Sequence, residues 1–183
     1  MIQSKNVYLR KEKSIMKRKA LIVIDMQKDF ISGSLGTKEA QTIVPVVKKL
    51  IDDGNYHKLF FTRDTHDDSY LDSQEGKMLP VIHCRYNTDG WQIDESLDTL
   101  SAEKIIDKPS FGWTGWKGLL DDISEVILAG LCTDICVISN ALIIKAFYPE
   151  MKVSIIENAT AGVTPERKAA ALETASSCQI NII

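Results

Sequence analysis

Three side chains that could together support nucleophilic catalysis each stand at the end of a predicted strand: Asp25, Lys108 and Cys136. A cysteine nucleophile needs a base that accepts the thiol proton and a cation that favours the thiolate. A helix is predicted to begin near Cys136, and the dipole and free N–H groups of a helix N-terminus would lower the pKa of the thiol. Taken singly, these residues are more often a turn residue, a solvated lysine and a small core residue. Their combination favours a cysteine-dependent enzyme.

A second group of residue types is suited to binding a divalent metal: Asp64, His66 and His83. In an Asp-x-His segment with extended backbone, both side chains point to the same side. Two imidazoles and a carboxylate suit zinc, iron or manganese, with open positions for water or substrate. The alternative is that both histidines are ordinary loop or cap residues, as isolated histidines usually are.

The backbone around Cys132 and Cys136 could hold an oxyanion, because N–H groups at the start of a helix lack partners within the helix. These two cysteines do not predict a zinc site. A zinc half-site would need a second pair of ligands at similar spacing, and Cys84 and Cys178 do not supply one.

Alternating apolar runs and helical patterns must position these side chains. The expected strands cover residues 20–24, 58–62, 104–107, 125–129, 152–156 and 179–183, and the expected helices cover residues 37–53, 133–147 and 165–177. This alternation predicts a Rossmann-like α/β fold with three layers, α/β/α, around a mostly parallel six-stranded sheet. In such a sheet the residues that follow the strands meet at one edge. Those residues are Asp25, Asp64, Lys108 and the 130–136 loop. Residues 67–98 show little periodicity and are predicted to form a long loop with short elements.

The composition is that of a globular domain. The chain has 183 residues, of which 44% are hydrophobic and 26% charged, and its net charge is −3. A single domain with a full hydrophobic core is expected. The small acidic excess argues against nucleic-acid and anionic-membrane partners, and no apolar run is long enough for a transmembrane helix.

The N-terminal residues 1–18 are basic and polar and are predicted to be a loose tail before a domain formed by residues 19–183. Whether Met1 or Met16 is the start is left open. Four cysteines occur without the spacing of a disulfide framework, and no export signal is evident. These features favour a location in the reducing cytoplasm.

Five short motifs follow one another in the chain. They are Ala20–Phe30 (Ala-Leu-Ile-Val-Ile-Asp-Met-Gln-Lys-Asp-Phe), Thr62–His66 (Thr-Arg-Asp-Thr-His), Pro80–Cys84 (Pro-Val-Ile-His-Cys), Lys108–Phe111 (Lys-Pro-Ser-Phe) and Gly130–Val137 (Gly-Leu-Cys-Thr-Asp-Ile-Cys-Val). In their order and spacing the chain resembles the isochorismatase-like cysteine hydrolases, a superfamily that includes nicotinamidases, pyrazinamidases and N-carbamoylsarcosine amidase. The resemblance covers nearly all of residues 19–183.

This resemblance implies a catalytic triad formed by Asp25, Lys108 and Cys136. It also implies a cis peptide bond just before Cys132. In the family this bond turns the N–H groups at the positions of Cys132 and Cys136 into an oxyanion hole.

The resemblance further implies that Asp64, His66 and His83 bind a divalent metal, as in the nicotinamidase branch. Isochorismatases and carbamoylsarcosine amidase generally lack this site. Glu75 stands where some relatives supply a glutamate ligand, and it is a candidate fourth ligand. The chain departs from many nicotinamidases at Thr65, where they carry a tryptophan before the first metal histidine.

The expected function is cleavage of a small, nicotinamide-like carboxamide to acid and ammonia through a thioester, with a divalent metal and no organic cofactor. Candidate substrate-pocket residues are the aromatic side chains Phe30, Trp91, Phe111 and Trp113. One alternative is a metal-poor hydrolase of a ureido or vinyl-ether substrate. Another is a non-catalytic flavodoxin-like module that binds a small molecule or a partner. Assembly as a homo-oligomer is left open.

Overall fold

The computed structural model describes residues 18–183, in which six strands form one sheet. The strands are β1 (Lys19–Ile24), β2 (Lys58–Asp64), β3 (Lys104–Lys108), β4 (Glu125–Leu131), β5 (Lys152–Ala161) and β6 (Asn181–Ile182). Their order is β3-β2-β1-β4-β5-β6, and every pair of neighbours is parallel. The chain therefore winds outward from β1 in both directions, and the predicted six-stranded parallel sheet is confirmed.

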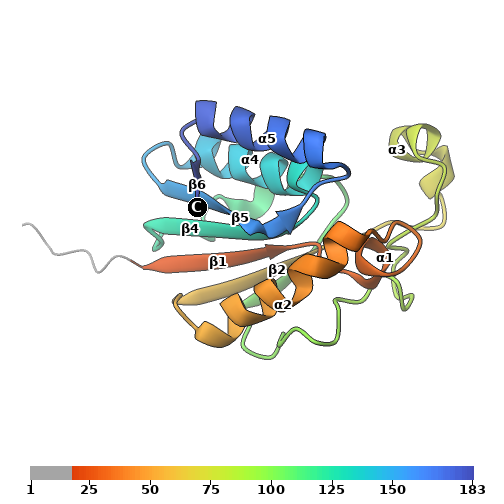
Figure 1. Ribbon diagram of the computed structural model, residues 1–183, viewed down its shortest axis with the longest axis horizontal. Coiled ribbons are helices and arrows are strands. Elements are labelled where there is room, and N and C mark those ends of the chain that lie inside the picture. The colour runs from red at the N-terminus through yellow and green to blue at the C-terminus, as the bar shows by residue number, and fades with distance from the viewer. Residues whose placement is uncertain (1–17) are drawn as a thin grey trace, which may run out of the picture.

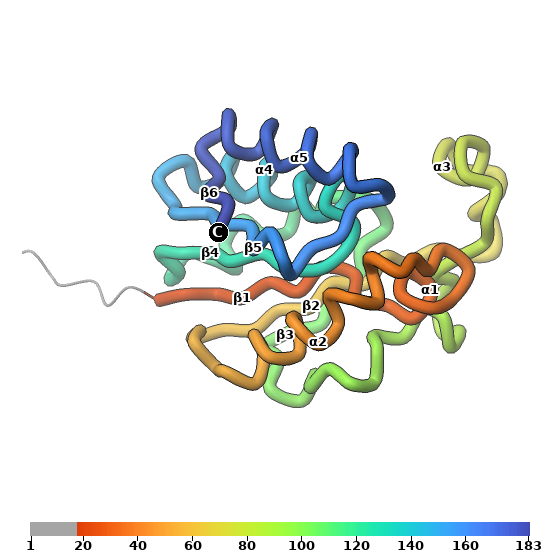
Figure 2. Tube along the Cα trace, viewed as in Figure 1, coloured from red at the N-terminus to blue at the C-terminus, as the bar shows by residue number. Residues whose placement is uncertain are grey.

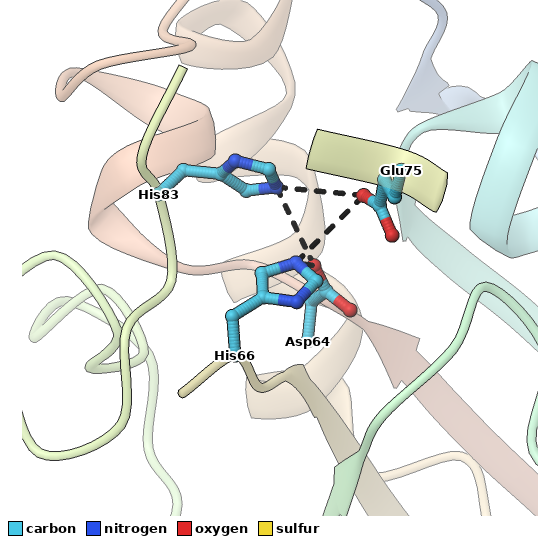
Figure 3. A group of neighbouring side chains, drawn as sticks. All are labelled: Asp64, His66, Glu75 and His83. Carbon is cyan, nitrogen blue, oxygen red and sulfur yellow. Dashed lines mark ion pairs between the residues drawn. The ribbon is translucent and has the colours of Figure 1, made fainter. Parts of the chain in front are cut away.

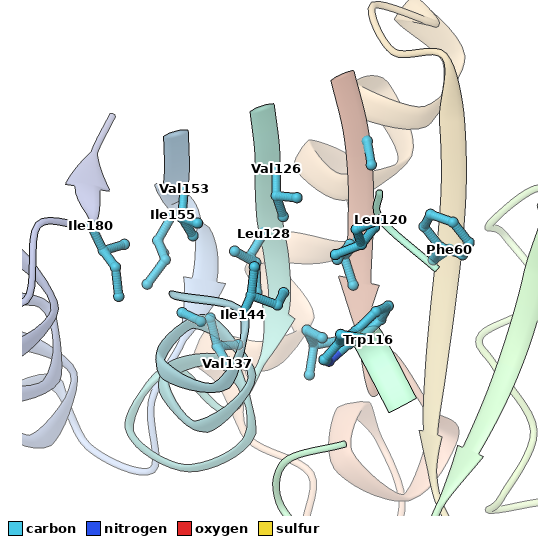
Figure 4. Packing of buried hydrophobic residues seen from close by; sticks show 14 of the residues in the cluster. Phe60, Trp116, Leu120, Val126, Leu128, Val137, Ile144, Val153, Ile155 and Ile180 are labelled. Carbon is cyan, nitrogen blue, oxygen red and sulfur yellow. The ribbon is translucent and has the colours of Figure 1, made fainter. Parts of the chain in front are cut away.

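Helices cover both faces of this sheet, as the three-layer prediction requires. Helix α2 (Lys38–Asp53) lies on one face, and α4 (Ile138–Phe147) and α5 (Pro165–Ser177) lie on the other (Figures 1 and 2). Side chains along a strand alternate between the two faces. In β1, Ile22 belongs to the core cluster shared with α4 and α5, whereas Val23 belongs to the cluster shared with α2. Figure 4 shows the first of these clusters.

Local sequence explains where helix α2 begins and ends. The Thr37 hydroxyl accepts a hydrogen bond from the N–H of Ala40 at 3.0 Å and caps the first turn. Gly54 ends the helix with φ of 61°, a conformation that glycine adopts without strain. The buried side chains of the helix recur at helical spacing, at Ala40, Ile43, Val47 and Ile51.

Element ends differ from the prediction at several places. Strands β2 and β3 run on to Asp64 and Lys108, so these side chains belong to the strand ends. Strand β5 continues to Ala161, beyond an irregularity in its pairing with β4. The last strand is shorter than expected, because Ile180 still donates its N–H to a carbonyl of α5.

The long stretch between β2 and β3 contains only short elements, as predicted. They include the 3₁₀ turn η1 (Tyr70–Asp72) and helix α3 (Gln74–Met78), which projects from the body beyond the short helix α1 (Lys28–Ile31) in Figure 1. A further 3₁₀ turn, η2 (Thr114–Trp116), follows β3. No helix within residues 18–183 is long and apolar enough to cross a bilayer.

Most of the predicted basic tail lies outside the described residues. Its last residue, Arg18, is described, and its guanidinium pairs with Asp122 at 2.5 Å. The boundary between tail and domain therefore stays a prediction. Cysteines 84, 132, 136 and 178 are all free.

Candidate active site

The carboxyl ends of β1, β2, β3 and β4 bring the predicted catalytic side chains to one edge of the sheet. Asp25 follows β1 directly, and Lys108 is the last residue of β3. Cys136 lies in a single turn of π-helix, η3 (Thr133–Val137), that connects β4 to α4. Such turns occur often at functional sites. The sequence predicts one helix over residues 133–147, and the π turn is how that helix begins.

Lys108 lies at the centre of this group and is fully buried. Its Nζ is 2.7 Å from Asp25 Oδ2 and 3.5 Å from Cys136 Sγ, and it donates to the Ser110 carbonyl oxygen at 3.2 Å. Asp64 Oδ1 is 3.4 Å from the same nitrogen. Burial would lower the pKa of Lys108, but the surrounding anionic groups outweigh this and raise it above its ordinary value. The side chain is therefore a buried ammonium ion.

Asp25 is held rigidly beside this cation. Its backbone adopts φ of 46°, a left-handed conformation that aspartate tolerates better than most residues. The Thr62 hydroxyl donates to Asp25 Oδ1 at 2.6 Å, and the N–H of Asp25 is 3.2 Å from the Thr62 carbonyl oxygen. Burial raises the pKa of the Asp25 carboxyl, although the neighbouring Lys108 acts in the opposite direction. A raised pKa suits a carboxylate that must accept a proton.

The thiol of Cys136 differs from the sequence-based expectation. Burial and the Asp25 carboxylate raise its pKa well above the ordinary value, and Lys108 opposes this only in part. The helix start and the nearby cation were expected to lower this pKa. The reason for the difference is that the side chain is buried and lies beside a carboxylate. The resting group is therefore a thiol, with a base next to it.

The peptide bond between Leu131 and Cys132 is cis, as the family resemblance implied. The carbonyl oxygen of Cys132 accepts hydrogen bonds from the N–H groups of Ile135 and Val137, both at 3.1 Å. These bonds fold the backbone of η3 around the nucleophile. The oxyanion hole predicted at Cys132 and Cys136 stays a prediction.

Four side chains that could bind a metal converge beside this group. Potential ligand atoms of Asp64, His66, Glu75 and His83 all lie within 4.8 Å of one another (Figure 3). His66 Nε2 is 2.8 Å from Asp64 Oδ2, and Glu75 Oε1 is 3.7 Å from that nitrogen. Glu75 is supplied by α3, so the projecting segment reaches back to the end of β2.

The two histidine rings present nitrogen atoms suited to a metal. His83 Nδ1 is 2.8 Å from the Val81 carbonyl oxygen. With Nδ1–H donated there, Nε2 keeps a free lone pair, as metal ligands require. His66 Nε2 is buried and faces the carboxylates of Asp64 and Glu75, at 2.8 and 3.7 Å. Burial would raise the pKa of Asp64, but the adjacent imidazoles of both histidines and the charge of Lys108 lower it instead. This donor set fits zinc, iron or manganese.

Sequence reasoning missed Gln27, whose fully buried side chain fixes the end of β2. Its Oε1 accepts from the N–H of Asp64 at 2.7 Å, and its Nε2 donates to the Asp64 carbonyl oxygen at 2.9 Å. The same Nε2 donates to the carbonyl oxygen of Trp91 at 2.9 Å. Beyond the end of the pairing between β1 and β2, the Gln27 carboxamide thus makes the two hydrogen bonds that a peptide group of a neighbouring strand would make to Asp64. The only signal in the sequence was its position two residues after Asp25.

A cavity of about 710 Å³ opens beside these groups. Its lining includes Asp64, Glu75, His83, Cys132 and Cys136 and many apolar side chains. Of the predicted pocket aromatics, Phe30 and Phe111 line the cavity. Trp91 is buried elsewhere, with Nε1 donating to the Thr65 hydroxyl at 2.9 Å and the guanidinium of Arg63 over its ring. Trp113 packs edge-on against Trp116 and against the hydrophobic core.

Tyr70 is a further residue at this site that the sequence did not indicate. Its buried ring lies 4.5 Å from the His66 ring and 5.0 Å from the His83 ring, between centroids. Its hydroxyl donates to the Leu79 carbonyl oxygen at 2.8 Å. The tyrosine therefore supports both imidazoles from η1 and ties the segment after α3 to them.

Comparison with known proteins agrees with this architecture. Nicotinamidase from Schizosaccharomyces pombe is 27% identical and aligns over 90% of this chain and 92% of its own length. The crystal structure of pyrazinamidase from Pyrococcus horikoshii in complex with zinc superposes with a TM-score of 0.78 at 29% identity, covering 91% of this chain and 98% of that one. Nicotinamidase/pyrazinamidase from Bacillus subtilis gives the same TM-score of 0.78 at 26% identity, over 90% and 98%. The isochorismatase domain family matches residues 19–183. The chain belongs to the isochorismatase family, as its five motifs predicted.

Proposed function

We propose that this protein is a cysteine-dependent amidohydrolase that cleaves a nicotinamide-like carboxamide to the acid and ammonia. The observation that carries the proposal is the buried group in which Lys108 Nζ contacts both Asp25 and Cys136, at the wall of a cavity large enough for a small aromatic amide. The nicotinamidase and pyrazinamidase relatives support the choice of substrate. The free cysteines agree with a cytoplasmic location.

In the first half-reaction, Cys136 Sγ attacks the carboxamide carbon while its proton passes to the Asp25 carboxylate. The tetrahedral oxyanion is held by the backbone N–H groups of Cys132 and Cys136. When the C–N bond breaks, Asp25 returns the proton to the leaving nitrogen, so that ammonia departs and a thioester remains. A water molecule then attacks the thioester with Asp25 as base, which releases the acid and restores the thiol.

Lys108 stabilises the negative charge that moves through this sequence. The charge is first on the Asp25 carboxylate and then on the attacking sulfur, and Nζ contacts both groups. Because the ammonium is buried and fixed, it needs no reorganisation when the charge shifts. We assign it no proton-transfer role, since its pKa is raised above an already high value.

Asp64, His66, Glu75 and His83 are the residues that would hold a divalent metal. The convergence of their ligand atoms within 4.8 Å and the orientation of the His83 ring support this assignment. The zinc complex of the Pyrococcus horikoshii relative also supports it. When bound, a divalent metal supplies a Lewis acid that can polarise a substrate carbonyl or pyridine nitrogen and lower the pKa of a bound water.

A panel of small primary amides, including nicotinamide and pyrazinamide, tests the proposed function through release of ammonia. We expect turnover of at least one aromatic carboxamide, and none of a ureido or vinyl-ether substrate at comparable rate. Turnover confined to the ureido or vinyl-ether substrates would overturn the proposal in favour of the metal-poor branch.

Removal of the metal is expected to lower turnover strongly while shifting the melting temperature only modestly. The hydrophobic core of a chain this long is sufficient for folding, so the metal would serve the reaction. His66→Ala and His83→Ala should behave like chelated wild type in an amidase assay and a thermal melt. His57→Ala is the matched control, because His57 lies before β2, away from the metal-binding residues, where its Nδ1 accepts a hydrogen bond from the Lys19 N–H. Unfolding on chelation, or full activity of metal-free protein, would contradict the prediction.

Gln27→Met is expected to weaken metal binding by about 10–100-fold, the usual effect of losing a residue that orients a ligand. The methionine has similar volume but leaves both backbone groups of Asp64 without their side-chain partner. A competition titration with a chromophoric chelator measures the change. Gln41→Met is the control, since Gln41 only donates to the Ile31 carbonyl oxygen at 3.2 Å. Equal metal affinity of Gln27→Met and wild type would show that Gln27 does not position the ligand.

A further inference from the structure

Asn140 is a polar residue buried within the apolar face of α4. It is fully buried, and all the hydrogen-bonding positions of its side chain are used. Oδ1 accepts from the N–H of Trp113 at 3.0 Å and from Trp116 Nε1 at 2.8 Å. Nδ2 donates to the carbonyl oxygens of Phe111 at 3.1 Å and Cys136 at 2.8 Å. One carboxamide therefore joins the segment after β3 to the turn that carries the nucleophile.

The two carbonyl groups that Nδ2 joins belong to two residues that line the cavity. Phe111 is an aromatic wall residue that is 44% exposed, and Cys136 is the proposed nucleophile. The residue before Phe111 is also fixed, because Lys108 Nζ donates to the Ser110 carbonyl oxygen at 3.2 Å. Gly112 allows the segment to cross α4 closely, because a Cβ there would come within 3.3 Å of Ser139 Cβ and would overlap the Ile143 side chain.

We propose that Asn140 is a positioning residue for amide hydrolysis, which holds the Phe111 wall and the Cys136 turn at a fixed separation through its Nδ2 group. This inference rests on the proposed function and adds a residue to it that touches no substrate. In a reactive pose, the ring of an aromatic amide must contact Phe111 while its carbonyl carbon lies next to the Cys136 sulfur. The separation of wall and nucleophile then determines whether a bound amide is also a reactive one.

A purely structural role is the competing explanation, because Trp116 is buried in the core (Figure 4) and its indole N–H donates to Asn140. The two roles use different ends of the side chain, so different variants separate them. In Asn140→Asp, carboxylate oxygens still accept from Trp113 and Trp116. Both N–H donors to the carbonyl oxygens of Phe111 and Cys136 are lost, and even a protonated carboxyl has only one O–H to donate, so at least one of these carbonyl groups loses its partner. In Trp116→Phe, the indole donor is lost but both Nδ2 bonds remain.

The test compares these two variants with wild type in three measurements: thermal melting, kcat and KM for nicotinamide, and the rate of iodoacetamide alkylation of Cys136. Alkylation is followed by peptide mass spectrometry relative to the exposed Cys178 of the same sample. We expect Asn140→Asp to lower kcat/KM by about 10–100-fold, the scale of a small misplacement of reacting groups. We also expect several-fold slower relative alkylation of Cys136. Trp116→Phe should lower the melting temperature but keep kcat/KM within about threefold of wild type.

The proposal is overturned if folded Asn140→Asp keeps both the wild-type kcat/KM and the wild-type alkylation ratio. It is equally overturned if Trp116→Phe shows the same losses. Alkylation does not depend on the substrate, so a wild-type protein that cleaves no amide would contradict the proposed function while the alkylation ratio still decides the role of Asn140.

If Asn140→Asp does not fold, Asn140→Ser tests the positioning role of Asn140 instead. A helical serine can donate to the carbonyl oxygen four residues earlier, here that of Cys136, but is too short to reach Phe111. We expect this variant to raise KM while the alkylation ratio of Cys136 stays near wild type. An unchanged KM for folded Asn140→Ser would refute the link between Asn140 and the wall.

Discussion

Replacing Cys136 by alanine is expected to lower amidase turnover by at least about 10⁴-fold while the protein stays folded. The substitution removes the atom that would form the thioester. Cys132 also lines the cavity, but among the described thiols only that of Cys136 contacts Lys108 Nζ. Cys84 is fully buried away from the cavity lining, and Cys178 is exposed near the end of α5. The loss of one small buried group should cost only about 1 kcal/mol of folding free energy. The size of the kinetic effect therefore separates catalysis from stability.

Cys178→Ala is the matched control for this experiment. It removes an exposed thiol and should keep wild-type turnover. Iodoacetamide should inactivate wild type and Cys178→Ala alike, with one label on Cys136 accounting for the loss. Protection of Cys136 by nicotinamide should slow that inactivation. Measurable wild-type-like turnover in Cys136→Ala would rule out the thioester route.

The place of the candidate site could be predicted from the sequence because the chemistry follows the topology. Alternating strands and helices imply a parallel sheet, and the carboxyl ends of parallel strands share one edge. Asp25, Lys108 and Cys136 each follow or end a strand, so their convergence needs only the strand order. The exact ends of β5 and β6 do not follow from residue patterns, since they depend on pairing with β4 and on where α5 ends.

The aromatic lining of the cavity could not be predicted in the same way. Phe30 and Phe111 line the cavity, whereas Trp91 and Trp113 do not. Large aromatic side chains are equally suited to core and to pocket, and the direction in which each points is set by tertiary packing. Trp91 does not line the cavity, because its indole N–H donates to the Thr65 hydroxyl and its ring packs under the guanidinium of Arg63. No spacing in the sequence encodes these contacts.

The two buried carboxamides, Gln27 and Asn140, show a related limit. Each makes hydrogen bonds to backbone groups more than 20 residues away in the chain. A glutamine or asparagine within an apolar pattern is an exception to that pattern, and its partners depend on which loops pass nearby.

The pKa of Cys136 is a third property that the sequence did not predict. The helix start and the lysine were visible in the sequence, but the burial that reverses their effect was not.

Asp25→Asn and Lys108→Met are each expected to lower turnover by about 10²–10⁴-fold, the range for loss of a general base or of a fixed charge beside it. If the two residues act as one unit, the double variant should be little worse than either single variant. Both variants keep side-chain volume, so neither leaves a large void among these buried side chains. Turnover of the double variant equal to the product of the two single losses would show that the residues act independently.

Stability should respond differently from activity, and the difference tests whether the ion pair is as buried as its geometry indicates. Lys108→Met leaves the carboxyl of Asp25 buried without its cation, which should cost about 3–5 kcal/mol. The double variant removes both charges and should be more stable than Lys108→Met alone.

The pKa of Asp25 is already raised by burial, and without Lys108 it should rise further above its unfolded value. Folding would then bind a proton, so the stability lost in Lys108→Met should be recovered as the pH falls from 7 toward 5. Urea denaturation of the four proteins at both pH values measures this. A deficit for Lys108→Met that does not shrink at pH 5, or a double variant no more stable than Lys108→Met, would mean that Asp25 is not held as a buried anion by Lys108.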